Sequence, residues 1–514
     1  MTIKLTLTYK STTIDLMTAG YMVRDGFYPE TATDMDKQVA DRLDVIVIGS
    51  SLADLDSKIR AIELAFEQAR RHTTGPDGCY IHYAIDTAMD AWRSRVTNGL
   101  VMHDGDLSRR AREFKAVLGL VVERAPYWEG PEVQLALSNP LGSGNTSGLK
   151  IYNPRIHYTN LTGTVSFDAT TQRINDAANG LADFLDGMTI RVEGSTSNDG
   201  PYTVTDGGNA GYIGVAGSAI VNETAGATIG IDGAVANYVE IAAADVIGNL
   251  AGAARLEITN TYNSINRVDT IWIGQNVESE PATFSHILEA EDAAGETTID
   301  SINSSGNKNK ECAWSDAAET NLLTWTLSTA ELNKLAGHYV RVIGRFGSIS
   351  GLWLRLKVKF ALTTLWEGPL TLMGTTQLQE ITSLRLPPYL LGAGDLYPLD
   401  LILSAKVTTA GAHSFTLDYL QLTTLDGWRK LAPKGYGLDY MIRIVDDGID
   451  SYLYTDGWIP GGKTGHYVGY GEPILLQPGK LQRLYFLHEE TTGSAPTNRT
   501  MSVKVYYRPR RLTI

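Results

Sequence analysis

The stretch DVIVIGSSLADLDSKIRAIELAFEQARR, residues 44–71, begins as a run of β-branched residues and ends as a helical pattern. Between the two, Ser51 and Asp54 form the S-x-x-D pattern of a capping box, in which side chains satisfy free backbone N–H groups at a helix start. The apolar residues that follow lie on one helical face: Leu55, Ile59, Ile62, Phe66 and Ala69. The stretch therefore predicts a strand and then a helix that packs on a sheet, and a cofactor role for this apolar stripe is not expected.

Further strand candidates surround this stretch within the first 137 residues. Several of them alternate polar and apolar positions with period two. They are IKLTLTY (3–9), CYIHYAI (79–85), WRSRVTNGLVM (92–102) and FKAVLGLVVER (114–124). One helix among several strands indicates a single α+β unit over residues 1–137.

The length and composition of the chain indicate several β-rich domains. A chain of 514 residues is too long for one hydrophobic core. Its 25 tyrosines and 51 glycines favour strands joined by turns. The cysteines, Cys79 and Cys312, define neither a disulfide framework nor a metal-ligand spacing. No segment has the length of a transmembrane helix and the start is not a secretion signal, so we expect a soluble protein without membrane insertion.

The charge balance argues against a general binder of polyanions. The formal net charge is −14, whereas nucleic-acid partners usually demand a basic face. We therefore expect no specific nucleic-acid binding. A local basic patch near the end of the chain, with Arg508, Arg510 and Arg511, is interpreted as a solvated terminus or a subunit contact.

Beyond residue 137 the sequence divides into β modules. One block has almost no basic residues and short strands separated by DG and GG turns, which predicts a small inserted β-barrel. A later block of alternating strands predicts a jelly-roll sandwich. The flanks of the barrel, 149–158 and 236–260, would be neighbouring strands without it. The predicted boundaries are 138–159 for a linker and first strands, 160–234 for the barrel, 235–279 for a connecting β segment, 280–432 for the jelly-roll and 433–514 for a C-terminal β segment.

The tetrapeptide WEGP occurs twice, at 128–131 and 366–369. Gly-Pro after a bulky residue is turn chemistry, because proline fixes φ and glycine relaxes it. We expect Trp128 and Trp366 to pack over a sheet edge where the chain leaves it. The surrounding residues do not align, so no domain duplication is inferred.

The N-terminal motifs carry a family resemblance. The series strand–GSS–helix, then WRSRVTNGLV, then LGLVVERAPYWEGPEVQLALSN resembles the N-terminal domain of distal tail proteins of long-tailed, siphovirus-like bacteriophages. The resemblance covers roughly the first 140 residues. It implies a β-sandwich with one α-helix, of which six copies close into a ring that joins the tail tube to the tail tip. It also makes a C-terminal galectin-like or carbohydrate-binding-like sandwich an expected companion.

The jelly-roll segment carries a second resemblance. ILEAEDAAG (287–295) and FTLDYLQL (415–422) resemble the first and last strands of carbohydrate-binding modules that begin with an E-A-E motif. The resemblance implies a structural Ca²⁺ held by Glu289, Glu291 and Asp418, since Ca²⁺ prefers several hard oxygen ligands. The alternative is that these are solvated carboxylates at a sheet edge. No other cofactor is expected.

Sugar sites use aromatic faces, which makes the tryptophans of the C-terminal two-thirds candidates. Most of them lie in strand patterns and are expected in cores. Trp314 in ECAWSD and Trp458 in YTDGWIPGG lie in loop-like contexts. These two are the residues we expect to contact a glycan if one is bound.

No catalytic constellation is found. The sequence has no G-x-S-x-G elbow, no H-E-x-x-H helix and no Walker loop. HDGDLS (103–108), with Asp104 and Asp106, fits a hairpin loop better than a cation site. We therefore expect no enzymatic activity.

The leading hypothesis is a virion protein of a phage tail tip, assembled in the host cytoplasm. Its partners would be copies of itself in a homohexamer, the tail tube protein, and the tail tip hub and tape-measure proteins. The outer domains would contact host-surface glycans, where multiple copies make weak sites useful. The alternative is a receptor-binding or carbohydrate-binding adhesin whose N-terminal domain serves only for attachment.

Overall fold

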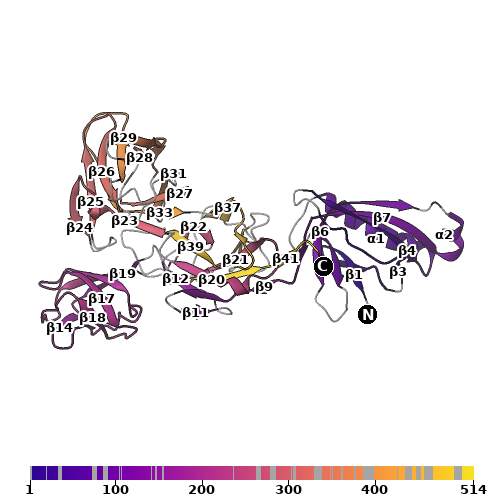
Figure 1. The fold of residues 1–514 in the computed structure, drawn as a ribbon, viewed down its shortest axis with the longest axis horizontal. Helices are drawn as coiled ribbons and strands as arrows, with labels where there is room; N and C mark the ends of the chain where they lie inside the picture. The colour runs from indigo at the N-terminus through magenta and orange to yellow at the C-terminus, as the bar shows by residue number, and fades with distance from the viewer. Residues whose placement is uncertain are drawn as a thin grey trace.

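The computed structural model is mainly β and multidomain, which confirms the predicted fold class. Figure 1 shows the N-terminal domain at one end of the long axis, a central sandwich beside it, and two further β domains at the other end. None of the helices in the described part of the chain has the length and hydropathy of a membrane span. The structure describes residues 3–513 apart from 19, 33–36, 72–77, 85–90, 104, 106, 140–141, 145–147, 153–155, 235–236, 262–267, 278–284, 302–303, 305–307, 329–338, 348, 350, 361–362, 375–377, 386–398, 425–426, 434–442, 447–452, 457–466 and 491–499.

The N-terminal domain is built on one strongly curved sheet. Its strand order is β2 (Thr12–Asp15), β1 (Lys4–Tyr9), β5 (Cys79–Ala84), β6 (Trp92–His103), β7 (Lys115–Arg124), β4 (Val39–Ile48) and β3 (Tyr21–Val23). The two end strands, β2 and β3, are joined by only a few residues, so the sheet must curl back on itself. The side chains inside the curl form one apolar core that includes Leu5, Val45, Leu118 and Trp128.

Helix α1 (Leu52–Arg70) covers this sheet as the sequence predicted. The Ser51 side chain accepts the Asp54 backbone N–H, and the Asp54 carboxylate in turn accepts the backbone N–H of Ser50 at 2.7 Å. The apolar stripe of the helix is buried from Leu55 to Ala69. Phe66 lies so close to β6 that a Cβ on Gly99 would be 2.4 Å from its ring. A glycine is therefore required at 99 for the helix to approach the strand.

A second helix, α2 (Leu107–Glu113), follows β6 where only a hairpin loop was expected. The six-residue motif 103–108 contributes His103 to the end of β6 and Leu107 to the start of α2. Asp104 and Asp106 lie outside the described residues. The expectation of one helix in this domain is therefore incomplete.

The central sandwich is assembled from three separated parts of the chain. Its first sheet has the order β11 (Gly142–Gly144), β10 (Leu137–Asn139), β20 (Tyr238–Ile241), β39 (Gln482–Glu490), β22 (Val268–Val277), β34 (Gly427–Pro433) and β37 (Tyr467–Gly471). Its second sheet has the order β12 (Leu149–Tyr152), β40 (Thr500–Tyr507), β21 (Gly252–Asn260), β35 (Arg443–Asp446) and β36 (Leu453–Asp456), with β38 (Leu475–Leu476) beside β21 and β9 (Val133–Gln134) beside β40. A single apolar core joins residues from all three parts, among them Leu137, Ile258 and Val503.

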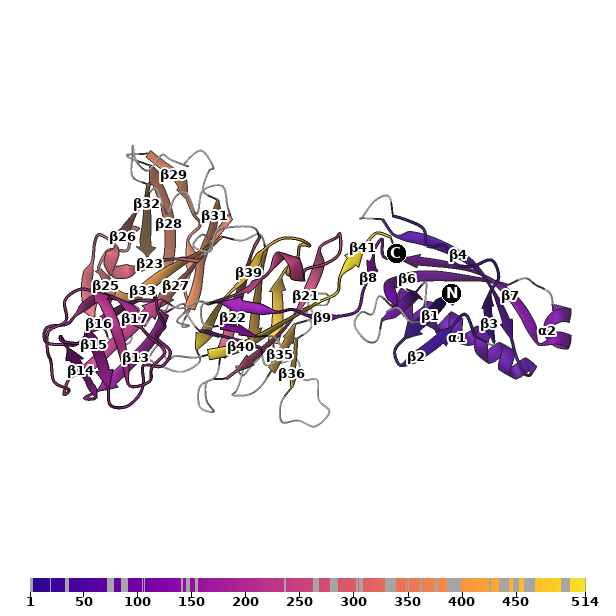
Figure 2. The same cartoon turned by 60° about the horizontal axis from the view of Figure 1, so that its bottom comes forward.

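Two domains are inserted in loops of this sandwich. The first is a curled antiparallel sheet of order β13 (Ile156–Thr162), β19 (Thr228–Ala234), β16 (Thr189–Glu193), β17 (Gly200–Asp206), β18 (Tyr212–Gly217), β15 (Arg173–Asp176) and β14 (Val165–Asp168). Its end strands are consecutive in the chain and its core is its own, which fits a small barrel. It lies between β12 and β20, and Figure 2 places it beside the second insert, at the far end from the N-terminal domain.

The second insert is a two-sheet sandwich between β22 and β34. One sheet has the order β24 (Thr297–Asp300), β25 (Lys308–Trp314), β33 (His413–Thr424), β27 (Tyr339–Phe346) and β31 (Leu378–Arg385), with β23 (Ser285–Glu289) beside β33. The other has the order β26 (Thr320–Leu327), β32 (Leu399–Lys406), β28 (Trp353–Phe360) and β29 (Thr363–Glu367), with β30 (Thr371–Leu372) beside β28. Their facing side chains form one core, as in a jelly-roll sandwich.

The expectation for the flanks of the barrel is wrong. Strand β12, before the barrel, pairs with β40, whereas β20, after it, pairs with β10 and β39. The two flanking strands therefore belong to opposite sheets of the central sandwich. The segments expected to be connecting and C-terminal pieces join β10 and β12 of the expected linker in this one domain, because each part alone exposes an apolar face that the others cover.

Candidate functional site

The first WEGP marks the passage from the N-terminal domain to the central sandwich. Trp128 and Glu129 form the short strand β8 (Trp128–Glu129). Trp128 is fully buried in the N-terminal core, where the Arg124 guanidinium lies 4.5 Å from its ring centroid. The expected packing over a sheet edge is therefore replaced by complete burial. Trp366 of the second WEGP is only partly buried, against the jelly-roll core.

The end of the chain returns to this passage and pairs with it. Strand β41 (Arg510–Arg511) is antiparallel to β8, and the Gly130 N–H donates to the Pro509 carbonyl at 2.8 Å. The Arg510 guanidinium donates to Glu129 Oε1 at 2.8 and 3.1 Å, and Arg93 donates to Glu129 Oε2 at 3.3 Å. Glu129 is 7% exposed, so this carboxylate neutralises two cations in a nearly dry junction.

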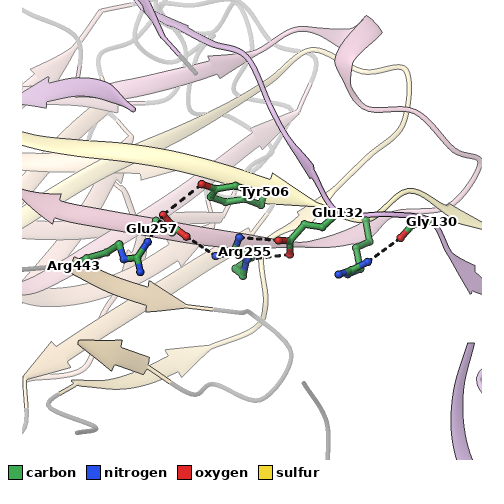
Figure 3. A network of polar contacts seen from close by, with 7 residues as sticks. Gly130, Glu132, Arg255, Glu257, Arg443 and Tyr506 are labelled. Carbon is green, nitrogen blue, oxygen red and sulfur yellow. Dashed lines mark hydrogen bonds and ion pairs between the residues drawn. The ribbon is translucent and has the colours of Figure 1, made fainter. Parts of the chain in front are cut away.

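A second polar network continues onto the central sandwich (Figure 3). Glu132 accepts from Arg255 at 2.8 and 3.0 Å, and Arg255 and Arg443 both donate to Glu257, at 2.6 and 3.0 Å. Burial raises the pKa of Glu257, but the hydrogen bond from Arg255 and the charge of Arg443 outweigh it and leave this pKa lowered. The Arg255 guanidinium also stacks on the Tyr506 ring at 3.9 Å. These contacts fix the segment that follows β8 to the central sandwich.

Part of the outer face of the N-terminal sheet carries apolar side chains. Residues opposed across antiparallel strands project to the same face of a sheet. The register places Leu100 opposite Val121, and Val117 opposite Ile46, all on the side away from the core. We call this set the outer apolar face, and its members are Met22, Ile46, Leu100, Met102, Val117 and Val121.

The outer apolar face is accessible in the single chain. Met22, Leu100 and Met102 are 50%, 53% and 49% exposed. Met102 lies across Gly119, since a Cβ at that glycine would be 3.1 Å from the Met102 methyl group. Charged residues border this face, since Arg42 lies opposite Val121 and Asp44 opposite Gly119. Exposed apolar side chains gathered on a solvent-facing sheet are nevertheless candidates for an interaction surface.

The three carboxylates expected to hold Ca²⁺ lie near the start of the jelly-roll. Glu289 ends β23, Glu291 lies in the short helix η4 (Ala290–Asp292), and Asp418 lies in β33. Asp418 is buried and accepts a hydrogen bond from Arg345. Within the described part of the chain, no group of three His, Cys, Asp or Glu side chains is arranged to hold a metal ion. Calcium binding therefore stays a prediction that would need backbone or water oxygens as further ligands.

Glu291 is electrostatically unusual. Its carboxyl oxygens are buried without a hydrogen bond, and Arg191 of the inserted barrel lies 3.9 Å from Oε1. Burial, followed by the charges of Asp418 and Asp292, raises its pKa to about 7. A second ion pair joins Lys308 of the jelly-roll to Glu193 of the barrel at 3.6 Å, so in this pair the jelly-roll supplies the cation and the barrel the anion. The two inserts are thus in contact through reciprocal charges.

The expected glycan contacts are not supported for Trp314. This residue ends strand β25, is 9% exposed and faces the jelly-roll core, so its ring face is not available to a sugar. The prediction that it lies in a loop is wrong, because the polar residues around it alternate as a strand. Trp458 lies outside the described residues.

An apolar seam attaches the jelly-roll to the central sandwich. Trp272 and Leu487 of the sandwich contact Ile287, Ile343 and Tyr419 of the jelly-roll. Beside this seam is a small hollow whose lining includes Trp428, with the Arg341 guanidinium stacked on its ring at 3.5 Å. Its lining also includes Gln421, Arg429 and Tyr485, and the hollow is a packing feature of the seam.

Glu129 and the outer apolar face were not identified from the sequence, and Arg510 of the expected basic patch is paired with Glu129 within the chain. Glu129 lies in a motif interpreted as a turn, and its partner Arg510 lies 381 residues away. Alternation in 115–124 does predict two faces of a strand, and the face away from the core carries Val117 and Val121 as well as Lys115 and Glu123. The two valines on the outward face of this central strand were the available signal.

Comparisons with known proteins add little. No protein-family model matches the chain, and no curated protein matches it. Among solved structures, a mutant VP2 protein of infectious bursal disease virus in T=1 particles is 9% identical over 70% of this chain and 77% of its own, with a TM-score of 0.17. The VP2 subviral particle of the same virus is 10% identical over 70% of this chain and 80% of its own, again with a TM-score of 0.17. Similarity at this level carries no argument about function.

Proposed function

We propose that this chain is a structural protein of a phage tail tip whose N-terminal domains assemble into a closed ring. The observation that carries the proposal is the outer apolar face, which is exposed on a domain whose motifs resemble those of distal tail proteins. Contact between that face and a different surface of the next copy would be heterologous, and heterologous contacts close into rings when the rotation is suitable. The homohexamer is the ring size that the resemblance implies.

The order of the domains fits this role. Both inserts lie at the end of the molecule away from the N-terminal domain (Figures 1 and 2). In a ring of N-terminal domains, the central sandwich would project outward and carry the barrel and the jelly-roll to the periphery. Weak contacts with host-surface glycans would there gain strength from several copies.

The double attachment at the junction supports a defined angle of projection. The linker strand and the returning C-terminal strand pair with each other, and Glu129 binds Arg510 between them. A single flexible linker would let the outer domains swing freely. Two paired strands resist that motion and suit an assembly that must present its outer domains in a fixed direction.

The remaining partners belong to the same proposal. The ring would stack on the tail tube protein on one side and on the tip hub and tape-measure proteins on the other. No enzymatic step is proposed for the chain.

Self-assembly of the purified chain tests the proposal. We expect mass photometry to show a discrete closed oligomer for the wild type and monomers for a double variant Leu100→Gln, Met102→Gln. The matched control is Leu475→Gln, an exposed apolar residue of the central sandwich, which should leave the oligomer intact. Monomers of the wild type that still bind host-cell glycans would favour the adhesin.

A further inference from the structure

A second outer surface of the N-terminal domain is cationic. On β1, β5 and the first half of β6, the register places Lys4 opposite Ala84, His82 opposite Arg93, and Tyr80 opposite Arg95. These residues lie on the side away from the core. Arg508 of the returning C-terminal segment lies close to Arg93 and donates to the Gly130 carbonyl at 3.1 Å. We call this set the cationic face, and its members are Lys4, His82, Arg93, Arg95 and Arg508.

Among the described residues, Arg93 and Arg508 have no carboxylate to themselves. Glu129 is shared by Arg93 and Arg510, and Glu132 is bound in a bidentate pair to Arg255. Among the described residues, Arg508 makes no ion pair and the buried Nε of Arg93 has no hydrogen-bond partner.

Two titratable groups respond to this local field. Burial, and then the charges of Arg93, Lys4 and Arg508, lower the pKa of His82 to about 4. Burial and the charge of Arg93 lower the pKa of Arg508, and the charges of Glu132 and Glu129 do not cancel this effect. Beyond the effect of burial, both shifts reflect the positive charges gathered here, in a protein whose net charge is −14.

We propose that the cationic face is a docking site for an acidic peptide segment of a partner protein, with Arg93 and Arg508 receiving its carboxylates. Guanidinium groups bind carboxylates through two parallel N–H donors, and such charge-assisted bonds are short and strong. The favoured ligand is a short peptide and not a nucleic acid, because the chain as a whole carries a net charge of −14, which opposes the approach of a long polyanion. This surface is separate from the outer apolar face, so the inference goes beyond the proposed ring contact.

The test is binding of a labelled polyglutamate peptide by the full chain, followed by fluorescence anisotropy at low ionic strength. We expect binding by the wild type, at least about tenfold weaker binding by Arg93→Gln, Arg508→Gln, and loss of affinity as salt screens the charges. The control Arg112→Gln changes an exposed arginine of α2, which Figure 1 places at the opposite end of the domain. It should bind like the wild type.

Three outcomes would overturn the proposal: equal binding by the double variant, equal binding by Arg508→Gln alone, or tighter binding of a double-stranded oligonucleotide than of the peptide through the same two arginines. The single variant is included because Arg93 also pairs with Glu129, so its loss should lower the melting temperature, whereas Arg508 makes no ion pair among the described residues. The Leu100→Gln, Met102→Gln variant should lose the oligomer and keep peptide binding, which separates failure of this inference from failure of the ring proposal.

Discussion

Replacement of Glu129 by Gln should loosen the return of the C-terminal strand to the N-terminal domain. The substitution keeps the shape of the side chain but leaves Arg510 and Arg93 without their shared countercharge. Loss of one partner costs about 3–5 kcal/mol in a fully buried pair, whereas an exposed pair contributes at most about 1 kcal/mol. The side chains of Glu129 and Arg510 are 9% and 13% exposed, so the junction lies near the buried limit. We expect a loss of roughly 2–3 kcal/mol in local stability.

Hydrogen exchange at single amides measures this loss directly. The Gly130 N–H is protected by its bond to the Pro509 carbonyl, and the expected loss corresponds to exchange that is roughly 30- to 150-fold faster. Glu472→Gln removes an exposed carboxylate of the central sandwich and serves as the control. If Gly130 exchanges at the same rate in the wild type and in Glu129→Gln, the claim that this carboxylate fastens β41 to β8 is refuted.

Other consequences follow from the packing and charges of the separate domains. Gly99→Ala should destabilise the N-terminal domain by about 1–3 kcal/mol, because the added methyl group meets the Phe66 ring. In calorimetry, the double variant Gly99→Ala, Phe66→Leu should recover part of this loss. Strictly additive losses from the two substitutions would contradict the contact. The raised pKa of Glu291, about 7 against an ordinary 4.5, means that the folded jelly-roll binds this proton more tightly than the unfolded chain. Its stability should therefore be greatest below about pH 4.5 with respect to this group and fall as the pH rises through about 7. Glu291→Gln should flatten that dependence and raise the free energy of unfolding at alkaline pH by roughly 1–2 kcal/mol after solvent screening, which thermal melts across the pH range would show. The exposed Glu311→Gln should not have this effect. An unchanged profile in Glu291→Gln would refute the assignment. If the jelly-roll holds Ca²⁺ through Glu291, chelation should lower the melting temperature of the wild type and not of Glu291→Gln, and equal effects on both would remove Glu291 from the metal site.

The local structure of the N-terminal domain was predictable because each signal lies within a few residues. The capping pattern at Ser51 fixes the start of α1, and the spacing from Leu55 to Ala69 fixes the face that it buries. Turn dipeptides and short alternating runs likewise identify the small barrel. The mainly β, multidomain fold follows from the same signals.

The central sandwich could not be predicted because its parts are joined only in space. Strand β21 pairs with β35 and β40, far along the chain and beyond the jelly-roll. Periodicity shows that each of these segments has an apolar face, but it does not show which other segment covers that face. The two inserts hide the relation further, because each has a complete core of its own.

The candidate surfaces were hidden for a similar reason. Glu129 becomes important only when Arg510 returns to it, and the cationic face gathers residues from three strands and the C-terminal segment. Trp314 shows the opposite error, since polar neighbours suggested a loop where a strand alternates. The charge balance and the exposure of these residues depend on which distant strands pair in the folded chain. No short sequence motif shows that pairing.

Electron microscopy of the purified full-length chain, with two-dimensional class averages, tests self-assembly most directly. We expect closed rings with a central hole and outer lobes formed by the central sandwich and its inserts, and we expect Leu100→Gln, Met102→Gln to abolish these rings. Rings that persist unchanged in that double variant would contradict the assignment of the outer apolar face. Single elongated particles of the wild type at high concentration would contradict self-assembly of this chain through its N-terminal domain.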